Sequence, residues 1–596
     1  MTGKQPRWVV VAAAASLFAG CVTGAQAESD PTDSVDLVIT GGTIYSGAEG
    51  ELPIVGDVAI RGDRIVHVGT RRAFKAARVI DARGMIVAPG FIDAHAHPDT
   101  YIRSPDAVQR LNAPWLMQGV STVVIGVDGA GTPDIKADTG ALIAARIGTN
   151  IVPFVGFGAV RSRVLGKDSR APTAEELDRM KGLVVQAMCE GAAGLSTGLF
   201  YAPQSFAETG EVIALAREAG RLGGIYDTHQ RDESSYSIGL LASVMEALRI
   251  GREASIPVHF AHLKALGVDV QGLAPQVIAL IAKARRQGID VTADQYPWLA
   301  SGTSLEAALI PHWAVDGGRD ALLHRLDNPA LLTRIRTEMR ENLRRRGGPA
   351  ALLLTSPGGP LTGKTLEQVA HDWGDVEPID AALRIVRTRF AEGDAAQGTG
   401  VASFNMSEDD VEAIMQQPWV VTGSDGSDGH PRQFATFPTK YAVYVRQEHV
   451  IDLASFIRRS TGLTADIYRL EKRGYLRKGH FADVLVFDPA TYGPRADYAH
   501  PDVLSSGVRL LLVNGATAVD AEQLTGAAAG RALLRAPCTG RQSERHAGFT
   551  ASGAPRVLPS APSRTRSRRR SHRCARGRRA GAPVSSGGSP ARTWPP

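Results

Sequence analysis

The chain has 596 residues, of which 43% are hydrophobic and 21% are charged. This length exceeds the usual size of one domain, and this composition excludes a wholly disordered chain. The formal net charge of +6 is unevenly distributed, because residues 536–596 hold thirteen arginines and one acid, Glu544, for a local charge of +12. The rest of the chain carries −6, so the folded part lacks an excess of basic residues and no nucleic-acid partner is expected.

Residues 1–27 have the pattern of a signal peptide. Lys4 and Arg7 precede an apolar run at 8–18, and the sequence Ala-Gln-Ala at 25–27 predicts cleavage before the mature chain. We therefore expect an exported, periplasmic protein.

A second hypothesis uses the sequence Leu-Phe-Ala-Gly-Cys at 17–21 as a lipoprotein cleavage site, with a lipid anchor on Cys21. The apolar run is about half of the ~20 residues that a membrane helix needs, so no transmembrane span is expected.

Both ends of the mature chain show short β-patterned runs separated by turn signals. Such runs occur at 36–40, 57–61 and 64–68, and again at 483–487 and 508–513. The last run is followed by Asn514-Gly515, a hairpin-turn dipeptide. We expect residues 28–88 and 475–535 to form one small β domain, a β-sandwich built from both chain ends.

The region 89–474 alternates apolar strands with longer helical stretches, a pattern typical of βα units around a parallel sheet. Helices are expected at 211–222 and 273–286. Eight strands predict an α/β fold, a TIM-like (β/α)₈ barrel, with the excess length forming an inserted subdomain at about 300–415. The strands are expected to end near Phe91, Ile125, Val155, Leu195, Thr228, Ala261, Ala293 and Thr422.

Of the four cysteines, Cys21, Cys189, Cys538 and Cys574, only Cys189 lies within the segment expected to be both mature and folded. No disulfide is therefore expected. Residues 536–596 are rich in Arg, Ser, Pro, Gly and Ala and are expected to form a disordered tail.

The segment from Pro89 to His97 indicates where chemistry occurs. It runs from an apolar strand into His95 and His97, and residues two apart on a strand share a face. Both imidazoles could therefore bind one cation, although a single His-x-His pair often arises by chance.

Other ligand-type residues also stand at predicted strand ends, where barrel enzymes assemble their sites. These residues are Asp128, His229, His262 and Asp425. Their convergence predicts a metal centre.

Eight segments between residues 36 and 535 resemble the amidohydrolase superfamily and, within it, the D-aminoacylase or N-acyl-D-amino-acid deacylase group. They are PGFIDAHAHPD (89–99), GLSTGLFYAP (194–203), YDTHQRDE (226–233), FAHLKALG (260–267), DQYP (294–297), GSDG (423–426), HPR (430–432) and GHFADVLVFDP (479–489).

This resemblance implies a TIM-like barrel beside a small β domain and a centre of one or two zinc ions. It implies hydrolysis of N-acyl-D-amino acids to a carboxylic acid and a free D-amino acid, with Asp425 as the catalytic base and acid. The metal ligands that it implies are His95, His97, His229 and His262. The substrate-binding residues that it implies are Lys264, Tyr296 and Arg432 for the carboxylate, and Tyr201 for the carbonyl or acyl group.

Asp128 departs from the group, which carries cysteine at this position. A carboxylate can also bind zinc, so one hypothesis is that Asp128 replaces the thiolate. The other is that histidines hold the metal and Asp128 only shapes its loop. Metal number and identity stay open at this point.

Two alternative functions stay open from the sequence. Cyclic-amide hydrolases, such as hydantoinases and dihydropyrimidinases, resemble this chain in fold but use a carbamylated lysine on the fourth strand, where this chain reads Gly-Leu-Ser-Thr at 194–197. A non-catalytic exported binding protein would keep the fold without a productive metal.

Overall fold

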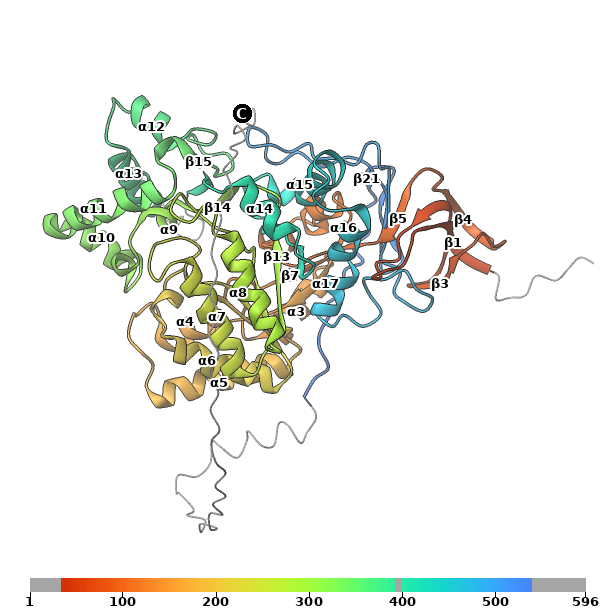
Figure 1. The fold of residues 1–596 in the computed structure, drawn as a ribbon, viewed down its shortest axis with the longest axis horizontal. Helices are drawn as coiled ribbons and strands as arrows, with labels where there is room; N and C mark the ends of the chain where they lie inside the picture. The colour runs from red at the N-terminus through yellow and green to blue at the C-terminus, as the bar shows by residue number, and fades with distance from the viewer. Residues whose placement is uncertain (1–33, 392–398, 539–596) are drawn as a thin grey trace, which may run out of the picture.

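The computed structural model describes residues 34–391 and 399–538 (Figure 1). The predicted leader 1–27, the lipid site Cys21, Cys574 and residues 539–596 of the predicted tail lie outside the described residues. No helix in the described part of the chain is both long and apolar enough to span a membrane.

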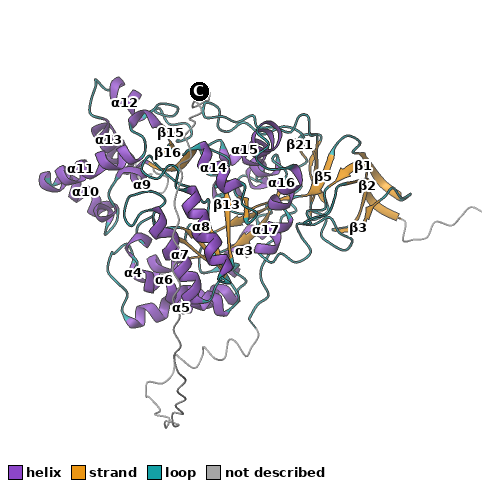
Figure 2. Ribbon diagram, viewed as in Figure 1, coloured by secondary structure: helices purple, strands orange, loops and turns teal. Residues whose placement is uncertain are grey.

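Strands from both chain ends form one nine-stranded sheet, seen on one side of the molecule in Figure 2. Antiparallel pairing of β5 with β18 joins the two ends. Strand β1 pairs with β4 along its first part and with β5 at its end, so the sheet branches at β1. The described strands of the small domain therefore form one branched sheet, where a β-sandwich was expected. The strands are β1 (Ser34–Ile44), β2 (Ile54–Arg61), β3 (Arg64–Gly69), β4 (Lys75–Asp81), β5 (Ile86–Pro89), β18 (Val484–Phe487), β19 (Val508–Val513), β20 (Ala516–Asp520) and β21 (Gln523–Leu524).

The predicted Asn514-Gly515 turn is confirmed. Both residues have positive φ, 51° and 82°, and they connect β19 to β20 in an antiparallel hairpin. Asn and Gly tolerate this left-handed conformation, which explains why this dipeptide identified the hairpin from sequence.

The middle of the chain forms parallel strands in two groups, and an expected strand end lies within three residues of each observed one. The first group is β6 (Phe91–Asp93), β7 (Val120–Ile125) and β8 (Asn150–Pro153). The second is β9 (Val155–Gly156), β10 (Gly194–Gly198), β11 (Ile225–His229), β12 (Val258–Phe260), β13 (Val291–Gln295) and β17 (Val420–Thr422).

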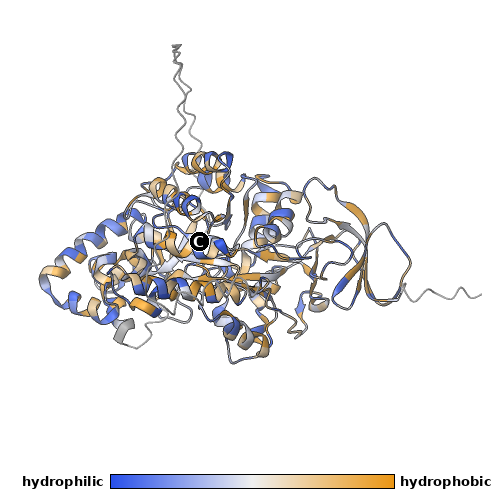
Figure 3. Ribbon diagram, turned by 90° about the horizontal axis from the view of Figure 1, so that it is seen from below, coloured by the Kyte–Doolittle hydropathy of each residue, from blue (hydrophilic) through white to orange (hydrophobic). Residues whose placement is uncertain are grey.

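Amphipathic helices cover these strands and bury a large apolar core against them. Figure 3 shows that helices of the molecule carry both hydrophilic and hydrophobic residues. The helices expected at 211–222 and 273–286 are confirmed as α6 and α8. The covering helices are α3 (Ile135–Ala144), α4 (Phe157–Leu165), α5 (Ala174–Cys189), α6 (Thr209–Arg221), α7 (Leu240–Ala254), α8 (Ala274–Arg286) and α14 (Glu408–Met415).

Shorter helical elements connect the strands. After β6 and β17 they are α1 (Asp99–Ile102), α2 (Ala113–Leu116), α15 (Arg432–Thr439), a π-helix (Lys440–Gln447), α16 (Leu453–Ser460) and α17 (Gly462–Ile467). The 3-10 turns are Gln109–Leu111, Gln204–Phe206, His312–Val315 and Pro349–Ala351.

Backbone hydrogen bonds connect the first parallel strand to the last. The amide of Ala94 donates to Thr422 O at 3.3 Å, and the amide of His97 donates to Gly426 O at 3.0 Å. In return, the amide of Asp425 donates to His95 O at 2.8 Å. The segments that follow β6 and β17 therefore lie side by side.

An inserted unit follows β13 and has its own apolar core. It forms the green end of the molecule in Figure 1. Asn328 caps α11, its longest helix, through the amides of Ala330 and Leu331. The insertion contains β14 (Ala300–Ser304), α9 (Leu305–Leu309), α10 (Arg319–Asp327), α11 (Pro329–Arg345), β15 (Leu352–Leu354), α12 (Leu366–Asp372), α13 (Pro378–Ala391) and β16 (Gly400–Phe404).

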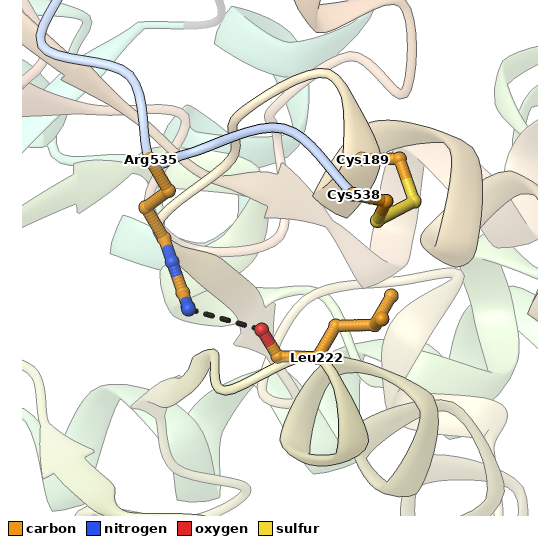
Figure 4. Close-up of a disulfide and its surroundings, with 4 residues drawn as sticks. All are labelled: Cys189, Leu222, Arg535 and Cys538. Carbon is orange, nitrogen blue, oxygen red and sulfur yellow. Dashed lines mark hydrogen bonds between the residues drawn. A yellow bond between two sulfur atoms is a disulfide. The ribbon is translucent and has the colours of Figure 1, made fainter. Parts of the chain in front are cut away.

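The prediction that no disulfide forms was wrong. Cys189, at the end of α5, is bonded to Cys538, 349 residues later (Figure 4). The prediction failed because the chain stays packed up to the predicted boundary at 535, three residues before Cys538. The Arg535 amide donates to Gly191 O at 3.0 Å, and its guanidinium donates to Leu222 O at 3.0 Å.

Replacing Cys189 and Cys538 by serine should lower the apparent melting temperature, because the bond closes a long loop and restricts the unfolded chain. A loss of about 2–4 kcal/mol in unfolding free energy is expected. Activity should be unchanged, since the bond lies away from the strand ends that carry the candidate site. Thiol titration of the denatured wild type should find two fewer free thiols than the reduced protein. Equal melting temperatures for wild type and variant would contradict this role.

Candidate metal centre

The ends of five parallel strands bring six predicted side chains together. They come from β6, β7, β11, β12 and β17, and all six are buried or half-buried. The six are His95, His97, Asp128, His229, His262 and Asp425.

Asp128 lies at the centre of this group. Its carboxylate oxygens lie 3.5 Å from His95 Nε2, 3.4 Å from His97 Nε2 and 3.5 Å from His262 Nε2. His229 Nδ1 is 3.7 Å away. A carboxylate this close to four imidazoles could bind the same metal ion as they would.

Two sets of ligand atoms are close enough to hold an ion. One consists of His95, Asp128, His262 and Asp425, and its ligand atoms all lie within 4.8 Å of one another. The other consists of His229, His262 and Glu233, a residue that we had not predicted as a site residue. Glu233 could have been suspected from its place in the YDTHQRDE segment, four residues after His229.

The hydrogen bonding of these groups fits a cation. Neither ring nitrogen of His95 has a hydrogen-bond partner among the described residues, and neither does Asp128 Oδ1, although all three atoms are buried. Buried polar atoms are normally satisfied, so such atoms call for an explanation. Imidazole nitrogens and carboxylate oxygens are suitable ligands for zinc and similar divalent ions.

Three of these residues also have strained backbones. Asp128, His262 and Asp425 have φ values of 53°, 33° and 49°. Positive φ is uncommon for residues other than glycine, and such strain gathers at functional sites.

A buried carboxylate, Asp93, positions the ends of β6 and β17. Asp93 accepts hydrogen bonds from Trp115 Nε1 at 2.7 Å, from the Ser424 amide at 2.8 Å and from the His95 amide at 3.2 Å. Asp294, a buried carboxylate on β13, accepts a hydrogen bond from the His262 amide at 3.0 Å. It therefore connects β13 to the segment that follows β12. We had assigned no role to either residue.

Charges within the site are strongly coupled. Burial opposes the ionisation of Asp425, but Arg432, whose Nη1 lies 2.6 Å from its Oδ2, and His262 hold its pKa well below the usual range. Burial lowers the pKa of His229 to about 4, which keeps this imidazole neutral. Burial opposes the charge on His97, yet Asp128 and Asp425 raise its pKa to about 10. A metal ion would therefore compete with protons for this site.

The four predicted substrate-binding residues surround the same region, but only Tyr201 and Lys264 line the adjoining pocket. Lys264 Nζ lies 2.8 Å from Glu233 Oε1. Tyr296 is buried between two cations, Lys264 and Arg432, which lie 5.5 and 5.2 Å from its ring centre. The pocket is also lined by Phe200, His229, Glu233, Ser234, Tyr236, Leu266, Ser301, Gly302, Thr303, Arg346 and Asp425.

Comparison with known proteins places these features in a family. A family model described as "Amidohydrolase family" matches residues 78–519. D-aminoacylase from Alcaligenes xylosoxydans xylosoxydans is 32% identical over 537 residues, covering 86% of this chain and 99% of that protein.

Two solved structures are similar over most of the chain. A D-aminoacylase structure that concerns a binuclear metal centre superposes with a TM-score of 0.69 at 32% identity, covering 84% of this chain and all of that one. The N-acyl-D-glutamate deacylase of Bordetella bronchiseptica, complexed with zinc and a phosphonate inhibitor, gives a TM-score of 0.71 at 30% identity and the same coverage. The fold is therefore the α/β fold of these enzymes, and this chain belongs to the amidohydrolase family.

Proposed function

We propose that this protein is a zinc-dependent hydrolase of linear amides, which converts N-acyl-D-amino acids to a carboxylic acid and a free D-amino acid. The observation that carries the proposal is the gathering of four imidazoles and two carboxylates at the strand ends, with buried nitrogens of His95 unpaired among the described residues. Relatives with deacylase activity match nearly their whole length to this chain.

His95, His97, His229 and His262 would hold one or two zinc ions, with Asp128 as a further ligand. Zinc, when bound, lowers the pKa of water and polarises the amide carbonyl. The central position of Asp128 favours direct coordination over a role limited to loop shape.

Asp425 would move the proton. Its low pKa keeps it ionised, so it can accept a proton from the attacking water and then pass it to the leaving nitrogen. Arg432, 2.6 Å away, would orient this carboxylate.

Lys264, Tyr296 and Arg432 would bind the substrate α-carboxylate, since the two cations flank the Tyr296 ring close to Asp425. Tyr201 would orient the acyl group, because its ring packs 4.8 Å from the His229 ring and faces the pocket.

We also propose that the two groups of parallel strands form one closed eight-stranded barrel, in which β8 and β9, separated only by Phe154, count as one interrupted strand. The hydrogen bonds from Ala94 to Thr422 and from Phe154 to Ile125 O, at 3.0 Å, support closure at both junctions. The cyclic-amide alternative finds no support, because β10 reads Gly-Leu-Ser-Thr-Gly and offers no lysine.

We propose that the protein is exported to the periplasm, either free or with a lipid on Cys21. The Cys189–Cys538 bond supports this proposal, because disulfides persist in oxidising compartments.

The activity can be tested on purified protein after removal of metal by a chelator. Adding zinc should restore release of D-amino acids from N-acetyl-D-amino acids, while the L forms should react at least about 100-fold more slowly. The readout is the enantiomer released, measured by chiral chromatography. No turnover of any N-acyl-D-amino acid by the zinc-loaded protein would disprove the proposed function.

Asp425→Asn should lower kcat by about 100-fold or more, because the amide cannot accept the proton. Metal content, measured by elemental analysis, should change little if the histidines and Asp128 hold the ions. Asp428→Asn, a half-exposed acid on the same loop, serves as the control and should keep activity. Normal turnover by the Asp425 variant would remove its proposed role.

Asp128→Asn separates the two hypotheses for Asp128. Asparagine tolerates the positive φ at this position, so the loop should be kept while the charged ligand is lost. We expect a lower metal-to-protein ratio, restored by Asp128→Cys, because a thiolate can also bind zinc. A full metal complement in the Asn variant would show that Asp128 only shapes the loop.

A further inference from the structure

A buried arginine from the insertion forms part of the pocket wall. Arg346 directly follows α11 and is 2% exposed. It lines the same pocket as Tyr201, Lys264 and Asp425, although it lies far from all three in sequence. No motif in the sequence singled it out.

Arg346 differs from the other cations of the site in its partners. Lys264 is paired with Glu233, and Arg432 with Asp425. Among the described residues, the side chain of Arg346 donates only to hydroxyl groups, which are neutral acceptors. They are Tyr236 Oη at 2.5 Å from Nε, and Ser301 Oγ and Ser403 Oγ, both at 3.3 Å from Nη1.

No carboxylate lies within 4 Å of Arg346 in residues 34–391 and 399–538, and no hydrogen bond there uses its Nη2. Its neighbours on the same helix behave differently. Arg344 pairs with Asp269 at 2.7 Å, and Arg345 pairs with Glu341 at 3.4 Å. Acidic partners are therefore available nearby, but Arg346 points away from them and into the pocket wall.

A buried charge without a counter-charge is costly. The carbonyls at the end of α11 offset part of this cost, since helix C-termini favour cations. Hydroxyl groups satisfy some of its N–H donors without neutralising the charge. A guanidinium held in this way is well suited to receive a carboxylate through two parallel hydrogen bonds.

The position of Arg346 indicates which carboxylate it receives. Lys264 Nζ lies 2.7 Å from the ring of His262, so it adjoins the metal ligands and the bond to be cut. The hydrogen bonds of Arg346 are to Tyr236 and two serines, and none is to a proposed metal ligand. Arg346 would therefore face a part of the substrate more distant from the amide than the α-carboxylate.

We propose that Arg346 binds the side-chain carboxylate of the substrate, so that N-acyl derivatives of acidic D-amino acids, D-glutamate or D-aspartate, are the preferred substrates. This inference rests on the proposed function and specifies its substrate class. Ser301 and Ser403 hold the guanidinium in place, and Tyr236 packs against it, with its ring centre 5.5 Å from the guanidinium carbon.

The test compares kcat/KM of the zinc-loaded protein for N-acetyl-D-glutamate, N-acetyl-D-aspartate, N-acetyl-D-methionine and N-acetyl-D-leucine. The wild type should prefer an acidic substrate. Arg346→Met, which keeps the length of the side chain, should lose about 100-fold on the acidic substrates and less than about threefold on the neutral ones. Arg346→Lys should recover part of the acidic activity.

Arg344→Met is the matched control, since Arg344 is exposed and lies on the same helix. It should leave the substrate preference unchanged. An equal loss on both substrate classes in Arg346→Met would overturn the proposal, because it would indicate an α-carboxylate or purely structural role. A wild type that prefers neutral substrates would overturn it as well, even if the Met variant does not fold.

Failure of the proposed function is distinguishable from failure of this inference. If the protein hydrolyses neutral but not acidic substrates, the proposed deacylase function stands and the proposed role of Arg346 is wrong. If no substrate is turned over, calorimetric binding of N-acetyl-D-glutamate decides. Binding that is about 100-fold weaker in Arg346→Met than in wild type supports the carboxylate site, and equal binding rejects it.

Discussion

Hydrogen bonds between the segments that follow β6 and β17 are the constraint on which the site depends. Three backbone bonds and the Asp93 carboxylate connect these segments, which belong to opposite ends of the parallel array. Without them, the histidines of the first strand would not face Asp425. Because Asp93 is fully buried, its own hydrogen bonds can be satisfied only when both segments are in place.

The same geometry concentrates charge. Six ionisable side chains lie close together at the strand ends, as the 3.4 Å between His97 Nε2 and Asp128 Oδ2 illustrates. Three of them, Asp128, His262 and Asp425, have positive φ values. The favourable interactions among carboxylates and imidazoles offset much of the desolvation that burial imposes. A divalent ion would satisfy these groups more completely, since it could bind one ring nitrogen of His95 together with Asp128 Oδ1, atoms that have no hydrogen-bond partner among the described residues.

The sequence was informative where local pattern and position coincide. Apolar runs predicted the ends of the parallel strands to within three residues. Ligand-type residues at or shortly after those ends predicted the six members of the candidate site. It was uninformative where distant segments meet. Arg346 enters the pocket from a segment whose path no periodicity indicates. Cys538 was assigned to a tail because composition gives no information on contacts between distant segments, such as the backbone bond from Arg535 to Gly191.

The inserted unit also contributes to the candidate site. Its core is separate from that of the parallel strands, yet β14 and the end of α11 supply Ser301 and Arg346 to the pocket. The parallel strands can therefore hold the proposed metal ligands and Asp425, while the insertion supplies Ser301 and Arg346 to the pocket wall. Since a buried guanidinium gains most from a carboxylate, a change confined to the insertion can alter substrate choice without disturbing the metal ligands.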